Sequence, residues 1–472
     1  MRLVTLLAAV SVSACAHRIE CEVHGGPVWR ELRTQHFEVL TDLPIEIARE
    51  EALNLEQMRL AIRWHFGLPA EADDFSKVIY LADPDELHEF TRVDGFARPA
   101  QVPEDSFLVS IWEKPNSRRR SNVIPHELTH RVSANVFPKT ARWIEEGTAG
   151  YLETMALDGP WKIKFGRPGD RFGRSGDTRS LEELWAMPYP TDTTPEISET
   201  YYESSWAWVH YLVNHEPEKW DQFIATLKAG GPPRTLFAAV FPESAWPALA
   251  KKVNLHRREA TFRARLVDVR YQRVIMQETA VPPWRVHLLR RTLASTSEKI
   301  ADDQRPAALM QEAETARAVA PTPIPWEVED AFASSVAERL EIADKHPESY
   351  GAHVVIASNR SQAPDAEMRV ARAAVDLEPN SPSGLLYLGL ALIQARDLPA
   401  ARAAIQRSEA LAPWAFQSAV GMARLTAAEG ECVEVINWLD RAALIGGQDA
   451  VHFLLEESER LTTRCARVSG RR

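Results

Sequence analysis

The sequence predicts a mixed α+β domain over residues 31–275, followed by an all-α domain of helical repeats over residues 285–465. Two observations predict this class. Short segments with the alternation of β-strands are interspersed with helical spacing in the first half. In the last third, Ala, Leu and Arg occur at helical spacing, and similar segments recur at a period of about 34 residues. A chain of 472 residues is long enough for two or three domains.

Apolar periodicity places the elements of the first domain. Strands are expected over residues 36–41, 77–82 and 106–112. Helices are expected over residues 43–65, 84–90, 217–229 and 246–264. The domain is expected to end between residues 255 and 285, because Pro282 and Pro283 form a plausible break.

A His-Glu-x-x-His motif lies between the third strand and the later helices. His126 and His130 fall on one face of a helix, because four residues make about one helical turn. Both imidazoles can then bind one metal ion, and Glu127 stands beside them to accept a proton. Since a catalytic zinc ion usually has three protein ligands, a further ligand must come from elsewhere. A second helix, predicted from about residue 140, offers Glu146, with Glu145 as the rival.

These two segments resemble the gluzincin metallopeptidases, in which a Glu directly before a Gly on the second helix completes the zinc site. Here that pattern runs from Trp143 through Glu146 and Gly147. Residues 131–145, fifteen in all, separate His130 from Glu146, which is similar to compact bacterial peptidase MA-like domains. The resemblance implies a zincin-like catalytic fold, one Zn²⁺ ion held by His126, His130 and Glu146, and hydrolysis of a peptide or protein substrate.

The same resemblance implies roles for further residues. Glu127 would act as general base, and a helix with Tyr202 would supply a donor to the oxyanion, with Tyr201 as an alternative and core packing as the simpler interpretation of Tyr202. Independently of the resemblance, Glu153 lies seven residues after Glu146 on the same helix face. It would hydrogen-bond a ligand histidine or the substrate amine, with a solvated carboxylate as the simpler alternative. By analogy, the strand at 106–112 would align the substrate through main-chain pairing.

The N-terminus predicts export. Residues 1–14 have a positive start, an apolar run too short to span a bilayer, and small residues before Cys15. This resembles a bacterial lipoprotein signal, which implies lipid on Cys15, a tether over residues 15–30 and a place on the periplasmic side of the outer membrane. The inner membrane or the cell surface stays open, and an ordinary secretory signal is the alternative.

The other cysteines and the charge add three expectations. Cys21 would be unpaired in the tether, whereas Cys432 and Cys465 would either pair or stay as thiols. The net charge of −11 argues against a nucleic-acid partner, which needs a basic face. No other cluster of His, Cys or Asp is expected to compete for a metal ion.

The C-terminal domain resembles tetratricopeptide repeats. Leu377-Glu378-Pro379 and Leu411-Ala412-Pro413 mark one feature twice, at the repeat length of about 34 residues. The resemblance implies an all-α solenoid of three or four repeats whose concave face binds a protein partner, or which supports the catalytic domain. The alternative for the whole chain is a catalytically silent lipoprotein whose repeats bind a protein.

Overall fold

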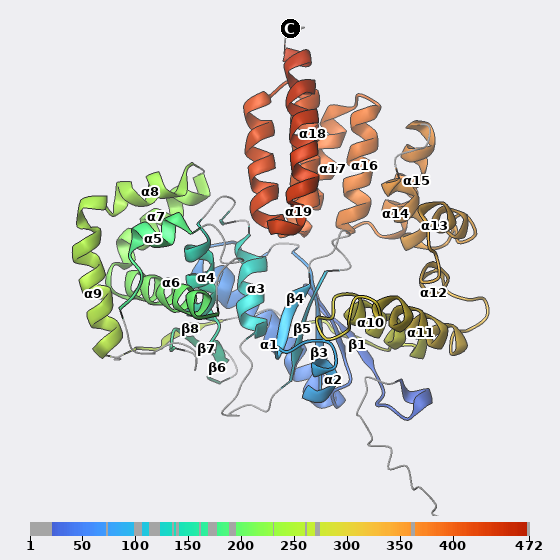
Figure 1. Ribbon diagram of the computed structural model, residues 1–472, viewed down its shortest axis with the longest axis horizontal. Helices are drawn as coiled ribbons and strands as arrows, with labels where there is room; N and C mark the ends of the chain where they lie inside the picture. The colour runs from blue at the N-terminus through green and yellow to red at the C-terminus, as the bar shows by residue number, and fades with distance from the viewer. Residues whose placement is uncertain are drawn as a thin grey trace, which may run out of the picture.

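The structure is a computed structural model that describes residues 21–71, 74–98, 106–112, 123–134, 136–137, 141–159, 162–168, 177–187, 195–229, 231–259, 262–269, 274–359 and 364–469. It combines a six-stranded sheet near the N-terminus with many helices toward the C-terminus (Figure 1). The predicted α+β part followed by an all-α part is confirmed in these terms. Cys15 and the predicted signal lie outside the described residues.

The main sheet has the strand order β4-β5-β3-β2-β1-β9. Its strands are β1 (Arg30–Arg33), β2 (Phe37–Thr41), β3 (Ser76–Leu81), β4 (Gly95–Arg98), β5 (Phe107–Ile111) and β9 (Gln277–Ala280). The three predicted strands are confirmed as β2, β3 and β5, which are mutually parallel. The other three pair antiparallel at the two sides of this group.

Both faces of the sheet are covered. Val78 and Leu108 enter one hydrophobic core, while their neighbours Ile79 and Val109 enter another, because successive side chains in a strand point to opposite faces. Helix α1 (Ile45–His65) packs in the first core. Helices α2 (Pro84–His88) and α10 (Pro283–Ser295) contribute to the second.

Beyond α1, the first core is completed by helices on one side of the sheet (Figure 1). These are α3 (Val123–Ser133), α4 (Arg142–Leu152), α5 (Leu181–Ala186), α6 (Pro195–His215), α7 (Pro217–Ala229), α8 (Pro233–Val240) and α9 (Trp246–Glu259). A small sheet packs beside them and consists of β6 (Ala156–Leu157), β7 (Lys162–Phe165) and β8 (Arg265–Asp268). The helix predicted over 217–229 is confirmed as α7. The helix predicted over 246–264 is present as α9, but it ends at Glu259 and residues 262–264 are not helical.

The two ends of the first domain differ from their predicted positions. Strand β9 extends the main sheet beyond residue 275, and α10 packs on the sheet's second face. Pro283 therefore begins a helix at a position that tolerates proline, and it does not mark a break between domains. Likewise Cys21 and Trp29 are buried in the second core, although the sequence places both in a tether.

The helical region continues with α11 (Arg305–Ala318), α12 (Trp326–Asp330), α13 (Val336–Ala343), α14 (Tyr350–Ser358), α15 (Pro364–Leu377), α16 (Pro382–Gln394), α17 (Leu398–Leu411), α18 (Phe416–Glu429) and α19 (Cys432–Ser469). The starts of α16 and α18, like those of α15 and α17, are separated by about 34 residues, the period of a two-helix repeat. Gly389 permits close packing inside this region, since a Cβ there would lie 2.3 Å from Ile405 Cγ1. No helix in the described ranges has both the length and the apolar character that crossing a bilayer requires.

Cys432 and Cys465 form a disulfide with a Cα–Cα distance of 5.6 Å. Both lie in α19, in which a straight helix would hold residues 33 apart at a distance of about 50 Å. The chain therefore turns back within this element, and the disulfide joins its two arms. Of the two alternatives from the sequence, pairing is the one that the structure contains.

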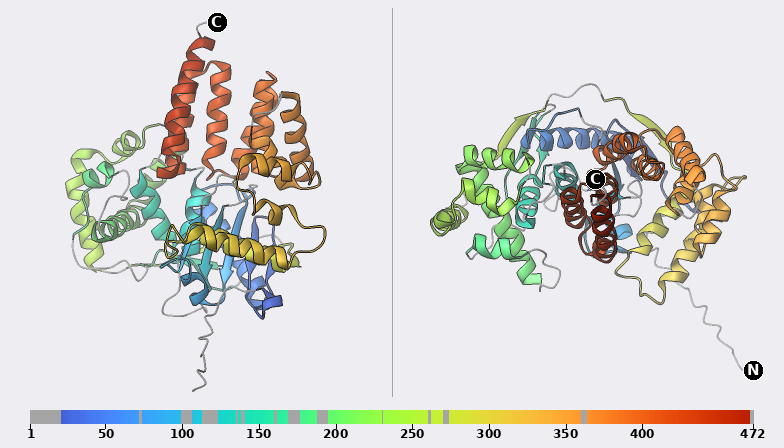
Figure 2. Two further views of the ribbon diagram at one scale, coloured as in Figure 1. Left: turned by 45° about the vertical axis from the view of Figure 1, so that its right-hand side comes forward. Right: turned by 90° about the horizontal axis from the view of Figure 1, so that it is seen from above.

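The helical region contacts the first domain near the His-Glu-x-x-His helix. The Arg131 guanidinium on α3 lies 4.3 Å from the ring centroid of Trp414, which follows α17. The backbone N–H of Phe75 donates to the carbonyl of Leu411. Both views in Figure 2 place α16–α19 beside the sheet domain. The last helices therefore contact the first domain at α3 and near β3.

Candidate metal centre

Helix α3 carries the two motif histidines on a different face from its core residues. Ile124, Leu128 and Val132, spaced four apart, are buried in the first core. His126 and His130 are offset by two residues from this row, so their side chains lie on a different face of the helix. His126 is buried, whereas His130 is half-buried and keeps contact with solvent.

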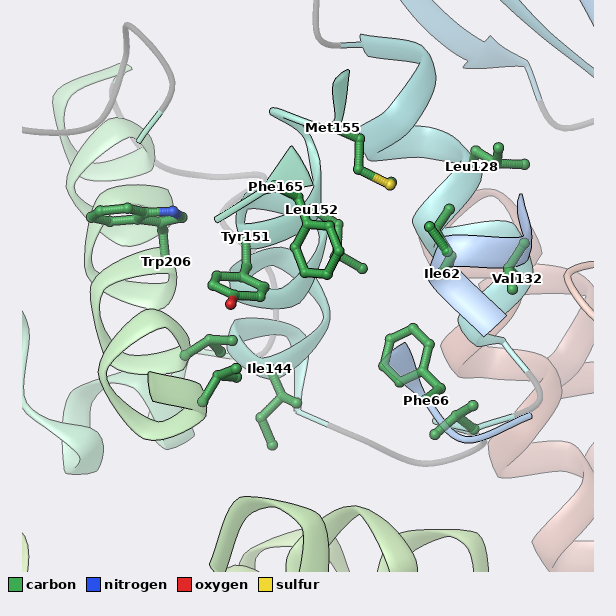
Figure 3. Packing of buried hydrophobic residues seen from close by; sticks show 14 of the residues in the cluster. Ile62, Phe66, Leu128, Val132, Ile144, Tyr151, Leu152, Met155, Phe165 and Trp206 are labelled. Carbon is green, nitrogen blue, oxygen red and sulfur yellow. The ribbon is translucent and has the colours of Figure 1, made fainter. Parts of the chain in front are cut away.

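Helix α4 is brought against α6 by a glycine. A Cβ at Gly147 would lie 2.3 Å from the carbonyl oxygen of Ser205 and 2.6 Å from Val209 Cγ2, so any larger residue would separate the helices. Figure 3 shows Tyr151 of α4 and Trp206 of α6 in one cluster with residues of α1 and α3. The glycine after Glu146 is therefore explained by packing, because it lets α4 lie close to α6.

Three donor atoms meet between α3 and α4. His126 Nε2 and His130 Nε2 are 3.2 Å apart, and Glu146 Oε2 lies 3.3 Å from the first and 3.6 Å from the second. Donors bound to one tetrahedral zinc ion at about 2.0–2.1 Å lie roughly 3.3–3.4 Å from one another. Two imidazole nitrogens and one carboxylate oxygen at this spacing fit a zinc ion. These three residues form one of two groups in the described chain that can hold a metal ion.

The electrostatics of the three residues are complementary. Burial would lower the pKa of His126, but hydrogen bonds with Glu146 and Glu153 outweigh it and raise that pKa to about 9. Burial would raise the pKa of Glu146, but His130, His126 and Arg142 hold it well below its usual range. Glu146 is therefore ionised at neutral pH, which is the form that binds a metal ion, whereas His126 is protonated without a metal and would release its proton on binding one.

Two residues hold these donors in place. Arg142 Nη2 lies 2.8 Å from Glu146 Oε1, which leaves Oε2 facing the imidazoles. His126 Nδ1 lies 3.2 Å from the buried Glu153 Oε2, an arrangement that orients the ring and directs Nε2 toward Glu146. Of the alternatives that the sequence leaves open for Glu153, the structure shows a buried carboxylate in contact with His126, not a solvated one. Arg142 was missed, although its position four residues before Glu146 on one helix was a usable signal.

The neighbouring glutamates occupy different positions. Glu127 is half-buried beside His126 on α3. Glu145 does not belong to the donor cluster, and burial raises its pKa to about 7 against the opposing effects of His130 and Arg142. Of the two adjacent candidates for third ligand, Glu146 is the one that meets the histidines.

Both candidate tyrosines of α6 lie near Glu146. The Tyr202 hydroxyl accepts a hydrogen bond from Arg142, and its ring is half-buried against the first core. Tyr201 is fully buried, and its hydroxyl has no hydrogen-bond partner in the described part of the chain. Burial and the charge of Glu146 raise the pKa of Tyr201, so its hydroxyl stays protonated.

The edge strand differs from the one that the sequence suggests. Strand β5, predicted over 106–112, pairs with β3 on one side and with β4 on the other, so its main chain cannot accept a substrate strand. The last strand of the described sheet on this side is β4, which precedes β5 and was not predicted. Its four residues, Gly95–Arg98, are too few for a periodic signal.

A second donor cluster was also missed. Cys21, His24 and His287 bring their ligand atoms within 4.8 Å of one another, although the sequence suggests no further metal-binding cluster. The Cys-x-x-His spacing of the first two was a signal. The third comes from a distant part of the chain, on α10, and depends on how that helix packs.

Comparisons of the chain with protein-family models, with curated proteins and with solved structures find no match.

Proposed function

We propose that the protein is a zinc-dependent metallopeptidase of the gluzincin type. The observation that carries the proposal is the triangle of donor atoms from His126, His130 and Glu146, with edges of 3.2, 3.3 and 3.6 Å. A zinc ion held there would supply Lewis acidity, lowering the pKa of a water molecule and polarising a carbonyl group. Glu127, adjacent to the ligand His126, would serve as general base for the water proton and then as acid for the leaving amine.

The tyrosines of α6 are proposed to assist at the oxyanion. The Tyr202 hydroxyl is engaged by Arg142, which also holds Glu146, so Tyr202 lies next to the ligand cluster. Tyr201 has a protonated hydroxyl with no partner among the described residues. Replacing each tyrosine in turn by phenylalanine identifies which one is the donor. The variant that loses the oxyanion donor should have a kcat lower by about 10²–10³-fold.

Substrate alignment is proposed at strand β4. Helix α3 packs against β4 and β5, so this edge of the sheet runs beside the donor cluster. An extended peptide could add to such an edge through main-chain hydrogen bonds. The sequence suggests this role for β5, and we assign it to β4 instead.

The C-terminal helices are proposed to form a tetratricopeptide-type solenoid. Their recurrence at about 34 residues and their close packing at Gly389 support this proposal. The Arg131–Trp414 contact favours a supporting role toward the zinc helix, with partner binding on the concave face as the second proposed role. Export and lipid anchoring through Cys15 remain proposals from the sequence.

The test is a Glu127→Gln variant assayed on a fluorogenic peptide library and on cell-wall stem peptides. The variant should keep one zinc ion at this site, because the three ligands are unchanged. Its kcat/KM should fall by about 10²–10⁴-fold, the usual contribution of general acid–base catalysis. Glu50→Gln, an exposed carboxylate on α1, is the control and should retain full activity.

Two results would contradict the proposal. One is wild-type protein that takes up no zinc at this cluster. The other is a Glu127→Gln variant with wild-type hydrolysis. A wild-type protein that binds zinc and cleaves none of the peptides would favour the alternative of a catalytically silent, partner-binding lipoprotein.

A further inference from the structure

A second group of donor atoms lies where the start of the described chain meets α10. Cys21 and His287 are buried, and His24 is exposed. Cys21 Sγ lies 3.5 Å from His24 Nδ1, and the rings of His24 and His287 meet edge to face at 5.3 Å between centroids. Of the three residues, Cys21 belongs to the second core, and the group shares no residue with the cluster on α3 and α4.

Local backbone structure turns Cys21 and His24 toward each other. Cys21 precedes the short 3₁₀ helix η1 (Glu22–His24), in which residues three apart eclipse one another. The backbone N–H groups of His24 and Gly26 both donate to the Cys21 carbonyl, and Gly25 closes the turn with a φ of 90°. The thiol and the imidazole therefore face the same side.

His287 presents a buried nitrogen without a partner. Its Nδ1 donates to Glu312 Oε2 at 3.0 Å, and Glu312 is held in turn by Arg290 Nε at 2.8 Å. In a neutral imidazole, a hydrogen bond donated by Nδ1 selects the tautomer that leaves a lone pair on Nε2. His287 Nε2 is buried and accepts no hydrogen bond from any described residue. A metal ion bound there would satisfy this nitrogen.

We propose that Cys21, His24 and His287 form a second transition-metal site, best matched to zinc, that ties the N-terminal segment to α10. A thiolate sulfur at about 2.3 Å and an imidazole nitrogen at about 2.0–2.1 Å from one tetrahedral zinc ion lie roughly 3.5 Å apart, as Cys21 and His24 do here. Three protein donors leave a fourth position on the solvent side, next to exposed His24. The carboxylate behind His287 completes the pattern of a ligating histidine.

The site has a structural consequence. Residues 21–29 contribute Cys21 and Trp29 to the second core, and they contact a helix from a distant part of the sequence. A metal ion shared between η1 and α10 would hold this segment on the sheet domain. It would do so independently of any reaction at His126.

Cobalt(II) is the probe that separates the two sites, because a thiolate ligand gives near-ultraviolet charge-transfer absorption and a His-His-Glu site does not. Metal-free full-length protein titrated with cobalt should take up two equivalents and show this band. Cys21→Ser and His24→Ala should each lose the band and one equivalent. His24 is exposed, so its replacement leaves the core intact.

Matched controls assign the signal. Cys15→Ser should retain the band, and Cys432 and Cys465 supply no thiolate because they form a disulfide. Glu146→Gln should retain the band while losing the other equivalent, so failure of the first site is distinguishable from failure of the second. In that background, zinc should raise the thermal unfolding midpoint, and His24→Ala should abolish the rise. A wild-type protein without the band, or a band that persists in Cys21→Ser, would overturn the proposal.

Discussion

Two histidine clusters in the first domain have opposite properties. His126 and His130 meet the carboxylates of Glu146 and Glu153, and the pKa of His126 is raised to about 9. The rings of His210, His256 and His215 form a chain in which His210 Nδ1 lies 2.9 Å from His256 Nε2. There burial lowers the pKa of His210 and of His256 to about 4.

The difference arises from the groups that face the rings. In the second cluster the ring nitrogens are occupied by one another, and His210 Nε2 donates to the carbonyl of Gly166 at 2.8 Å. No carboxylate takes part in these hydrogen bonds, so burial and the neighbouring imidazoles disfavour a positive charge. Histidines in contact are therefore not by themselves a metal site. The cluster on α3 and α4 differs in that an ionised carboxylate, Glu146, faces both rings.

The largest expected effect comes from removing that carboxylate. Glu146→Gln should abolish zinc binding at His126 and His130, because a neutral amide is a much weaker zinc ligand than a carboxylate. Zinc content measured by plasma mass spectrometry should fall by one equivalent. Glu145→Gln is the matched control, one residue away on the same helix, and should keep the ion. Equal loss in both variants would mean that the choice of Glu146 is wrong.

A smaller effect is expected for Glu153, which contacts His126 but is not itself a proposed zinc ligand. Glu153 accepts from His126 Nδ1, and its replacement leaves all three ligands present. Glu153→Gln should weaken zinc affinity by about 10–100-fold. Competition with a chromophoric chelator measures this change. An unchanged affinity would show that Glu153 is a buried carboxylate without influence on the zinc ligands.

The second cluster predicts acid sensitivity. His210 and His256 have folded-state pKa values of about 4, below the unfolded value of about 6.5. Their stabilising contribution is therefore complete above about pH 6.5 and is lost as the pH falls toward 4, since the unfolded chain binds the protons first. In His210→Gln the free energy of unfolding should fall less steeply over this window, by up to about 1.4 kcal/mol per pH unit. Urea unfolding at a series of pH values measures the slope. An unchanged slope would mean that His210 does not contribute to the pH dependence of the free energy of unfolding.

Local pattern predicted those parts of the molecule that depend on neighbours in sequence. Periodicity placed β2, β3 and β5 and the helix α7, because a buried strand or an amphipathic helix repeats its apolar positions. It missed β4 and β9, which have four residues each and are ordered by pairing with the sheet. The sequence pattern also assigned α10 to the repeat domain. The spacing of apolar residues in α10 does not reveal that this helix covers the second face of the main sheet.

For the candidate site, the sequence by itself determined the residue types and the pairing of His126 with His130, because four residues close one helical turn. Tertiary structure decided what joins them. Spacing alone leaves Glu145 and Glu146 open and the resemblance selects Glu146; the packing of α4 beside α3 brings Glu146, and not Glu145, to the imidazoles. The docking of α10 on the sheet brings His287 to Cys21. Contacts between distant segments depend on which buried faces fit together, and sequence spacing carries no record of that fit.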